Sequence, residues 1–136
     1  MATNVSRGAA AKGRTKKYLQ AQGYQVADLE VVRYIFAKGG RMPVKRDQFG
    51  SDLLAVNDIE VVFVQVKSGK TATGGTFAGA RREFERHTFP DGVVCRIIAW
   101  PPRARHPRVI DVLKPSGAYI EHPQPTKGSH GKESKG

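Results

Sequence analysis

The sequence is poor in cysteine and in long apolar runs. Cys95 is the only cysteine among 136 residues, which excludes an internal disulfide framework. It lies within the apolar run VVCRIIAW, where a small buried thiol is expected rather than a nucleophile. No apolar stretch approaches the roughly 20 residues that a membrane-spanning helix needs. The first residues, MATNVSRGAAAKGRTKK, lack the apolar core of a signal peptide, so we expect a cytoplasmic protein without a membrane partner.

Acidic residues are scarce as well. The chain has 12 aspartates and glutamates against 23 lysines and arginines, which gives a formal net charge of +11. Residues 123–136 contribute only +2 of this charge, so the basic character belongs mainly to the rest of the chain. A polyanion relieves self-repulsion of this kind, and nucleic acid is the usual one. The alternative is a generic basic surface without a nucleic-acid partner.

What the sequence does contain is enough apolar residues, 39% of the chain, for one domain with its own core. Residues 24–37 are interpreted as one strand, or as two that are broken near Asp28. Residues 38–50 and 68–75 are predicted to be loops. Apolar periodicity and turn residues predict two helices, over 6–22 and 76–89, and further strands over 51–56, 59–67, 93–100 and 108–113.

The order of these elements predicts an α/β fold, with a mixed central sheet flanked by helices. We expect it to occupy residues 1–114 as a single domain. From Pro115 the composition shifts to glycine, proline, serine and lysine, and residues 115–136 are predicted to be a disordered basic tail.

Two polar residues interrupt the most apolar strand. Side chains alternate along a strand, so Gln65 and Lys67 share a face with Phe63. Burying Gln65 without partners would cost about 1–3 kcal/mol, and a buried ammonium costs more. The Asn57–Asp58 turn joins this strand to the preceding one and brings Asp52 close to the same end of the sheet. A carboxylate, an amide oxygen and an ammonium are therefore expected to converge.

These groups suit a site for a divalent cation that acts on a phosphodiester. Mg²⁺, or Mn²⁺ in its place, prefers oxygen ligands, which Asp52, Gln65 and the backbone carbonyl of Val66 can supply. Lys67 can orient the attacking water or stabilise the charge that develops on the phosphate. The alternative is an ordinary strand end, in which the backbone satisfies Gln65 and Lys67 extends to solvent.

The stretch DLLAVNDIEVVFVQVK, from Asp52 to Lys67, has the pattern Asp-x12-Gln-x-Lys and resembles the core of the PD-(D/E)xK nuclease superfamily. It is most similar to archaeal-type Holliday junction resolvases and to VRR-Nuc domains, over roughly residues 6–113. The resemblance implies a restriction-endonuclease-like fold, with Asp52 and Gln65 as metal ligands and Lys67 as the catalytic lysine. It departs from the resolvases in one respect, since AAAKGRTKKYL lacks the glutamate that they carry in the first helix.

The function implied is that of a metal-dependent DNA endonuclease, a hydrolase of phosphodiester bonds that acts in DNA recombination and repair. Within that class, the resemblance points to a structure-selective Holliday junction resolvase that acts on branched DNA. A homodimer is then expected, because a four-way junction offers two symmetric cleavage points. The alternatives are a non-catalytic DNA-binding module that keeps the nuclease fold and, from charge alone, an RNA-binding protein.

Several basic residues are candidates for phosphate contacts, although a solvated cationic face is the alternative for each. The DNA-binding candidates are Arg7, Lys12, Arg14, Lys16, Lys17, Arg41, Lys45, Arg46, Lys70 and Arg81. Other motifs carry less. SGKT lacks the full phosphate-binding loop pattern, the histidines show no zinc spacing, and Trp100 is expected to cover the edge of the core.

Overall fold

The computed structural model of the chain describes residues 4–29, 31–37, 39–46, 49–72, 77–113 and 118–124. Two α-helices and a short 3-10 helix accompany eight strands in the described part. In chain order these are α1 (Asn4–Ala21), β1 (Gln25–Asp28), β2 (Val31–Ala37), β3 (Gly40–Arg46), β4 (Leu53–Val56), β5 (Val61–Ser68), η1 (Gly69–Ala72), α2 (Ala78–Glu85), β6 (Val93–Trp100), β7 (Arg108–Leu113) and β8 (Ala118–Glu121).

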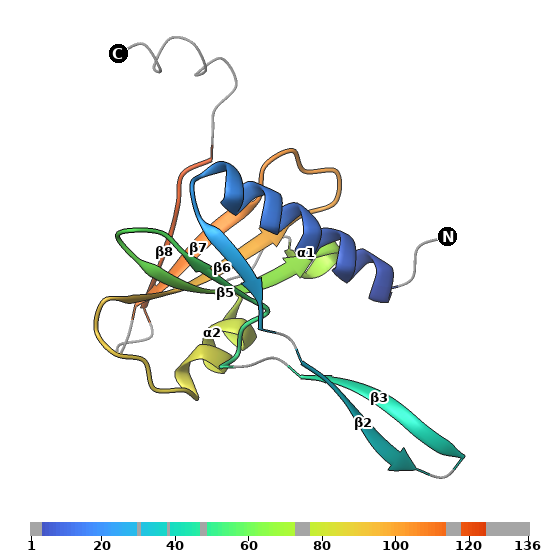
Figure 1. Ribbon diagram of the computed structural model, residues 1–136. Helices are drawn as coiled ribbons and strands as arrows, with labels where there is room; N and C mark the ends of the chain where they lie inside the picture. The colour runs from blue at the N-terminus through green and yellow to red at the C-terminus, as the bar shows by residue number, and fades with distance from the viewer. Residues whose placement is uncertain are drawn as a thin grey trace, which may run out of the picture.

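Six strands form the central sheet in the order β1-β4-β5-β6-β7-β8. The pair β5–β6 is parallel and the other neighbours are antiparallel, so the sheet is mixed. A parallel pair needs a crossover connection, and α2 lies within it. Figure 1 shows α1 and α2 on different sides of the sheet. The predicted α/β architecture, a mixed central sheet flanked by helices, is confirmed.

The alternation of side chains along the strands divides the apolar residues between two cores. On one face, Leu19 of α1 packs with Val62 and Val64 of β5. On the other face, Phe84 of α2 packs with Ile97 of β6. Fully burying a large apolar side chain contributes about 1.5–3 kcal/mol. The nearly continuous apolar sequence of the central strands is explained by this covering of both faces.

The hairpin β2–β3 differs from the expectation that residues 38–50 form a loop. Residues 40–46 form a strand that pairs with β2 from Val31 opposite Arg46 to Ala37 opposite Gly40. Gly39 and Gly40 have φ of 96° and 123°, and this conformation, which glycine adopts readily, closes the hairpin. Gly39, which was interpreted as a loop residue, therefore lies in the turn, and Gly40 begins β3. Figure 1 shows the hairpin extending away from the central sheet.

Strand β8 lies in the segment that was expected to be disordered from residue 115. It pairs with β7, and the ion pair between Arg108 Nε and Glu121 Oε2, 2.7 Å apart, joins the two strands. The His122 amide then donates to the carbonyl of Val109, and the Gln124 side chain donates to that of Pro107. The four residues AYIE suit a strand, but the polar residues on either side of them led to the prediction of disorder. Residues 125–136 of the predicted tail lie outside the described residues.

The remaining elements agree with the sequence more closely. The broken form of the first predicted strand is confirmed, since β1 ends at Asp28 and β2 begins at Val31. The helix α2 is shorter than predicted, and part of the expected loop after β5 is the 3-10 helix η1. Cys95 is fully buried, and Trp100 is 5% exposed, as expected. Among the helices described, none is long and apolar enough to cross a membrane.

Candidate metal site

Asp52 occupies the point where three strands of the central sheet meet. Its backbone N–H donates to the carbonyl of Val64 in β5 over 2.8 Å, and its carbonyl accepts from Leu29, just after β1, over 2.9 Å. One carboxylate oxygen, Oδ2, accepts a hydrogen bond from the backbone N–H of Val66 over 2.7 Å. Both the backbone and the side chain of Asp52 are thus fixed at the entrance to β4.

Val66 presents its backbone to the same place. A strand residue directs its N–H and its C=O towards the same neighbouring strand. Because the Val66 N–H points to Asp52, its carbonyl also faces the side on which Asp52 lies. The role of the Val66 carbonyl as a further oxygen ligand stays a prediction.

Gln65 is 3% exposed and only half satisfied. Its Nε2 donates to the carbonyl of Gly50 over 2.5 Å, while its Oε1 is buried without a hydrogen-bond partner. Exchanging the two amide atoms would place Oε1 against another carbonyl oxygen, so the hydrogen bond fixes the orientation. An unsatisfied buried acceptor costs about 1–3 kcal/mol. In the described part of the chain, no other buried side-chain nitrogen or oxygen lacks a partner.

The turn before Asp52 sets the position of the Gly50 carbonyl. Phe49 and Gly50 both have positive φ, 55° and 67°. A Cβ on Gly50 would lie 3.1 Å from the carbonyl oxygen of Glu83 in α2, so the turn approaches the helix more closely than a larger residue allows. Ser51 is fully buried and donates to the Phe49 carbonyl over 3.1 Å. The turn therefore holds Gln65 between the sheet and α2.

Lys67 shares its face of β5 with Gln65 and lies where the strand runs into η1. Its side chain is partly exposed and makes no hydrogen bond or ion pair with any other described residue. Two hydrogen bonds, Gln65 to Gly50 and Val66 to Asp52, join β5 to the turn and the start of β4. They hold the predicted ligands Asp52 and Gln65 in neighbouring positions. The structure thus brings the predicted residues to one end of the sheet.

The oxygen donors here fit Mg²⁺ in kind, because a carboxylate, an amide oxygen and a backbone carbonyl are all ligands that this cation accepts. The orphaned Oε1 of Gln65 supports this fit, since a cation would satisfy it. The site is weak in charge. Helix α1 carries no acidic residue, and no group of three His, Cys, Asp or Glu side chains suited to a metal occurs among the described residues.

The predicted DNA-binding cations differ in their surroundings. Some have intramolecular partners: Lys12 and Lys16 form ion pairs with Asp28, whose pKa is lowered by its hydrogen bond from Lys16 despite partial burial. Arg14 lies over Trp100, with 4.0 Å between guanidinium carbon and ring centre, and Arg81 lies over Tyr119 at 4.5 Å. Lys17 is exposed, and Arg41 is exposed but lies over the ring of Tyr34. The side chains of Arg7, Lys45, Arg46 and Lys70 lie outside the described part of the structure.

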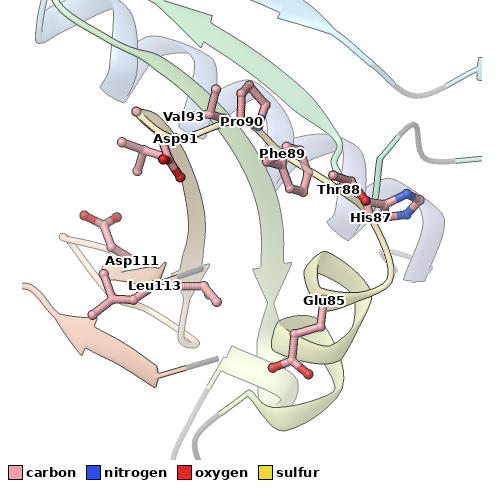
Figure 2. A pocket seen from close by; sticks show the side chains of 12 residues that line it. Glu85, His87, Thr88, Phe89, Pro90, Asp91, Val93, Asp111 and Leu113 are labelled. Atoms are coloured by element: carbon pink, nitrogen blue, oxygen red, sulfur yellow. The ribbon is translucent and has the colours of Figure 1, made fainter. Parts of the chain in front are cut away.

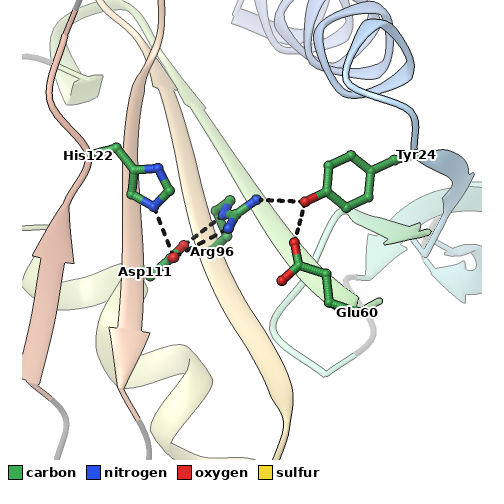
Figure 3. A network of polar contacts seen from close by, with 5 residues as sticks. All are labelled: Tyr24, Glu60, Arg96, Asp111 and His122. Carbon is green, nitrogen blue, oxygen red and sulfur yellow. Dashed lines mark hydrogen bonds and ion pairs between the residues drawn. The ribbon is translucent and has the colours of Figure 1, made fainter. Parts of the chain in front are cut away.

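A charged network on the opposite face of the sheet was not predicted. The guanidinium of Arg96, 8% exposed as a residue, contacts Asp111 at 2.7 Å, and Asp111 also contacts His122 at 2.9 Å (Figure 3). Burial raises the pKa of Asp111, but the hydrogen bonds from Arg96 and His122 outweigh it and lower that pKa. Tyr24 completes the network, because its hydroxyl accepts from Arg96 and donates to Glu60. Burial and the hydrogen bond to Glu60 raise the pKa of Tyr24. In the sequence, the signal for this network was a charged residue inside each of two apolar strands, Arg96 and Asp111.

A cavity of about 640 Å³ opens beside the loop between α2 and β6. Its lining includes the carboxylates of Glu85, Asp91 and Asp111, but Figure 2 shows that Glu85 lies apart from the other two. Neither Asp52, Gln65 nor Lys67 lines it. The cavity is therefore separate from the candidate metal site.

Comparisons with known proteins give similarities among solved structures only. No protein-family model matches the sequence, and no curated protein matches it. Among solved structures, Hjc of Archaeoglobus fulgidus, described as a Holliday junction resolvase from an archaeal hyperthermophile, is similar over 75% of this chain and 70% of its own. The identity is 17% and the TM-score is 0.43. These values are too low to transfer an activity, and the comparisons do not bear on the similarity to VRR-Nuc domains.

Proposed function

We propose that this chain is a metal-dependent DNA endonuclease whose site is built from Asp52, Gln65 and Lys67. The observation that carries the proposal is the buried Oε1 of Gln65, which has no hydrogen-bond partner. The carboxylate of Asp52 is fixed by the N–H of Val66, the residue that follows Gln65. A purely structural glutamine would be expected to satisfy both ends of its amide. The match of these residues to the pattern of the PD-(D/E)xK nucleases supports the same conclusion.

Each residue has a distinct role in the proposed reaction. Asp52 and Gln65, with the carbonyl of Val66, would hold Mg²⁺ or Mn²⁺. When bound, the cation supplies charge neutralisation at the phosphate and a more acidic water. The ammonium of Lys67 orients the water or stabilises the charge that develops on the phosphate oxygens. The hydrogen bond from Val66 holds the Asp52 carboxylate in place, and the bond to Gly50 holds the Gln65 amide.

DNA is the proposed substrate because the chain is strongly basic, with a net charge of +11. Branched DNA and a homodimer follow from the resemblance to Holliday junction resolvases. A second candidate, a non-catalytic DNA-binding module, is favoured by the absence of acidic residues from α1, because a single carboxylate gives a cation little charge to bind.

Cleavage of labelled linear, flapped and four-way DNA, with Mg²⁺, Mn²⁺ or EDTA, tests the proposal. We expect cleavage with metal and none with EDTA, and Lys67→Ala should lower the rate at least tenfold while DNA affinity is retained. Retained affinity is expected because many other cations contact the phosphates. Binding without cleavage under every metal condition would favour the non-catalytic module.

A further inference from the structure

The hairpin β2–β3 is a cationic and aromatic projection from the molecule. It forms a two-stranded sheet of its own and extends away from the central sheet (Figure 1). Residues 31–46 contain five lysines and arginines and no acidic residue. A segment with this charge complements a polyanion and repels a basic protein surface, including that of a second copy of this chain.

The aromatic residues of the hairpin are exposed together. Tyr34 is 57% exposed and Phe36 is 87% exposed, and their spacing places them on the same face of β2. Arg41 is paired in register with Phe36, and its guanidinium lies over Tyr34, with 4.6 Å to the ring centre. Two neighbouring aromatic rings with an attached guanidinium form a contact surface, whereas a single exposed ring would need no explanation.

The base of the hairpin is connected to the candidate metal site. Before β2, the N–H of Leu29 donates to the carbonyl of Asp52 over 2.9 Å. After β3, the chain itself returns to Asp52 through the turn at Phe49 and Gly50. The base of the hairpin therefore lies next to Asp52, while Phe36 and Arg41 lie near its far end.

We infer that the hairpin β2–β3 is a ribbon that enters the major groove of duplex DNA and holds that duplex beside the metal site. The inference rests on the proposed function and specifies how the substrate is bound. Each strand has seven residues, about 23 Å at roughly 3.3 Å per residue, and the two backbones lie about 4.8 Å apart. The major groove is about 12 Å wide and admits a two-stranded ribbon of this kind. Arg41 contacts base edges or phosphates, and Phe36 contacts the bases.

The test compares two double variants by their affinity for a labelled duplex in EDTA, at low salt. Phe36→Ala with Arg41→Ala removes the exposed ring and its paired guanidinium. Ile59→Ala with Arg105→Ala is the matched control, since both residues are exposed and lie outside the hairpin. We expect the hairpin variant to lose affinity about tenfold or more, the control to bind as the wild type does, and both to melt at the wild-type temperature.

Dimethyl sulfate protection on the same duplex identifies the groove, because guanine N7 lies in the major groove and adenine N3 in the minor groove. We expect the wild type to protect guanine N7 and the hairpin variant to lose that protection. Unchanged affinity in the hairpin variant, protection of adenine N3 alone, or hairpin-dependent binding of single strands in preference to duplex would overturn the inference. Cleavage assays separate this inference from the proposed function. Cleavage that does not depend on the hairpin would refute the role of the hairpin alone. Binding that depends on the hairpin, without cleavage, would refute the nuclease function alone.

Discussion

At the scale of single residues, Gln65 carries the functional argument. The strand alternation that placed Gln65 and Lys67 on one face is confirmed, but the degree of burial is greater for Gln65 than for Lys67. One end of the Gln65 amide is satisfied by Gly50, as the strand-end alternative expects, and the other end is not. We therefore assign the hydrogen bond to structure and propose that the orphaned oxygen binds the cation.

Replacing Gln65 by glutamate tests this division. Gln65→Glu places a buried carboxylate oxygen against the Gly50 carbonyl, so the metal-free protein should lose about 1–3 kcal/mol of unfolding free energy. A second carboxylate should at the same time raise Mg²⁺ affinity, so added Mg²⁺ should raise Tm more than in the wild type. Thermal melting with and without Mg²⁺ measures both effects, with the exposed Gln25→Glu as control. A Tm independent of Mg²⁺ in Gln65→Glu would contradict the assignment of Gln65 as a ligand.

Asp111 provides a test of the network on the opposite face. Its folded pKa lies below the unfolded value of about 3.9, because Arg96 and His122 stabilise the carboxylate against the effect of burial. The stabilisation is therefore fully present above about pH 4 and is lost as pH falls through the folded pKa. Asp111→Asn should destabilise the protein by about 3 kcal/mol at pH 5. Melting curves should show this difference shrinking below pH 4, and a constant difference down to pH 3 would refute the ion-pair account.

At the scale of elements, the sequence was most informative where apolar periodicity was regular. The central-sheet strands other than β8, and the two helices, were predicted because the alternation of Val62, Phe63 and Val64 and the helical spacing of Phe84 reflect burial. Strand β3, its pairing with β2, and strand β8 were missed. Tyr34, Phe36 and Arg41 of the hairpin and all four residues of β8 are exposed, so pairing across the ladder rather than burial defines these strands. Gly39 lies in a tight turn rather than in a long loop.

Truncation distinguishes strand β8 from the residues that follow it. A chain that ends at residue 124 should melt like the full chain, because residues 125–136 contain no large apolar side chain to bury. A chain that ends at residue 114 loses β8 and the Arg108–Glu121 ion pair. Several hydrogen bonds at about 0.5–1.5 kcal/mol each predict a loss of about 2 kcal/mol. Equal denaturant midpoints for the two truncations would show that β8 contributes nothing to stability.

At the scale of the whole molecule, we propose that the positive charge binds DNA and that the site cleaves it. The cations were predicted from the sequence as one group, but the structure shows that some are engaged by partners such as Asp28 and Trp100. Such pairings depend on which distant residues fold together, and no local pattern reveals them. The gathering of Asp52, Gln65 and Lys67 was predictable because a hairpin and strand alternation were sufficient to place them.

The salt dependence of DNA binding tests the separation among the cations. Each phosphate contact releases counterions and adds roughly −0.9 to the slope of log affinity against log salt. Lys17→Ala, which removes an exposed cation, should make the slope about 0.9 less steep. Lys16→Ala should change it less, because that ammonium is paired with Asp28 at 2.8 Å. Affinity that does not vary across a salt titration would refute electrostatic binding to DNA.

The most direct test of the proposed site is the Mg²⁺-dependent cleavage rate of Asp52→Asn on four-way and linear DNA. Asparagine keeps the shape of the side chain and its hydrogen bond from Val66 but removes the negative charge that Asp52 supplies to the site. We predict a loss of cleavage of about 100-fold or more, with DNA affinity retained and with the exposed Asp58→Asn cleaving at the wild-type rate. Wild-type cleavage by Asp52→Asn would contradict the proposed site.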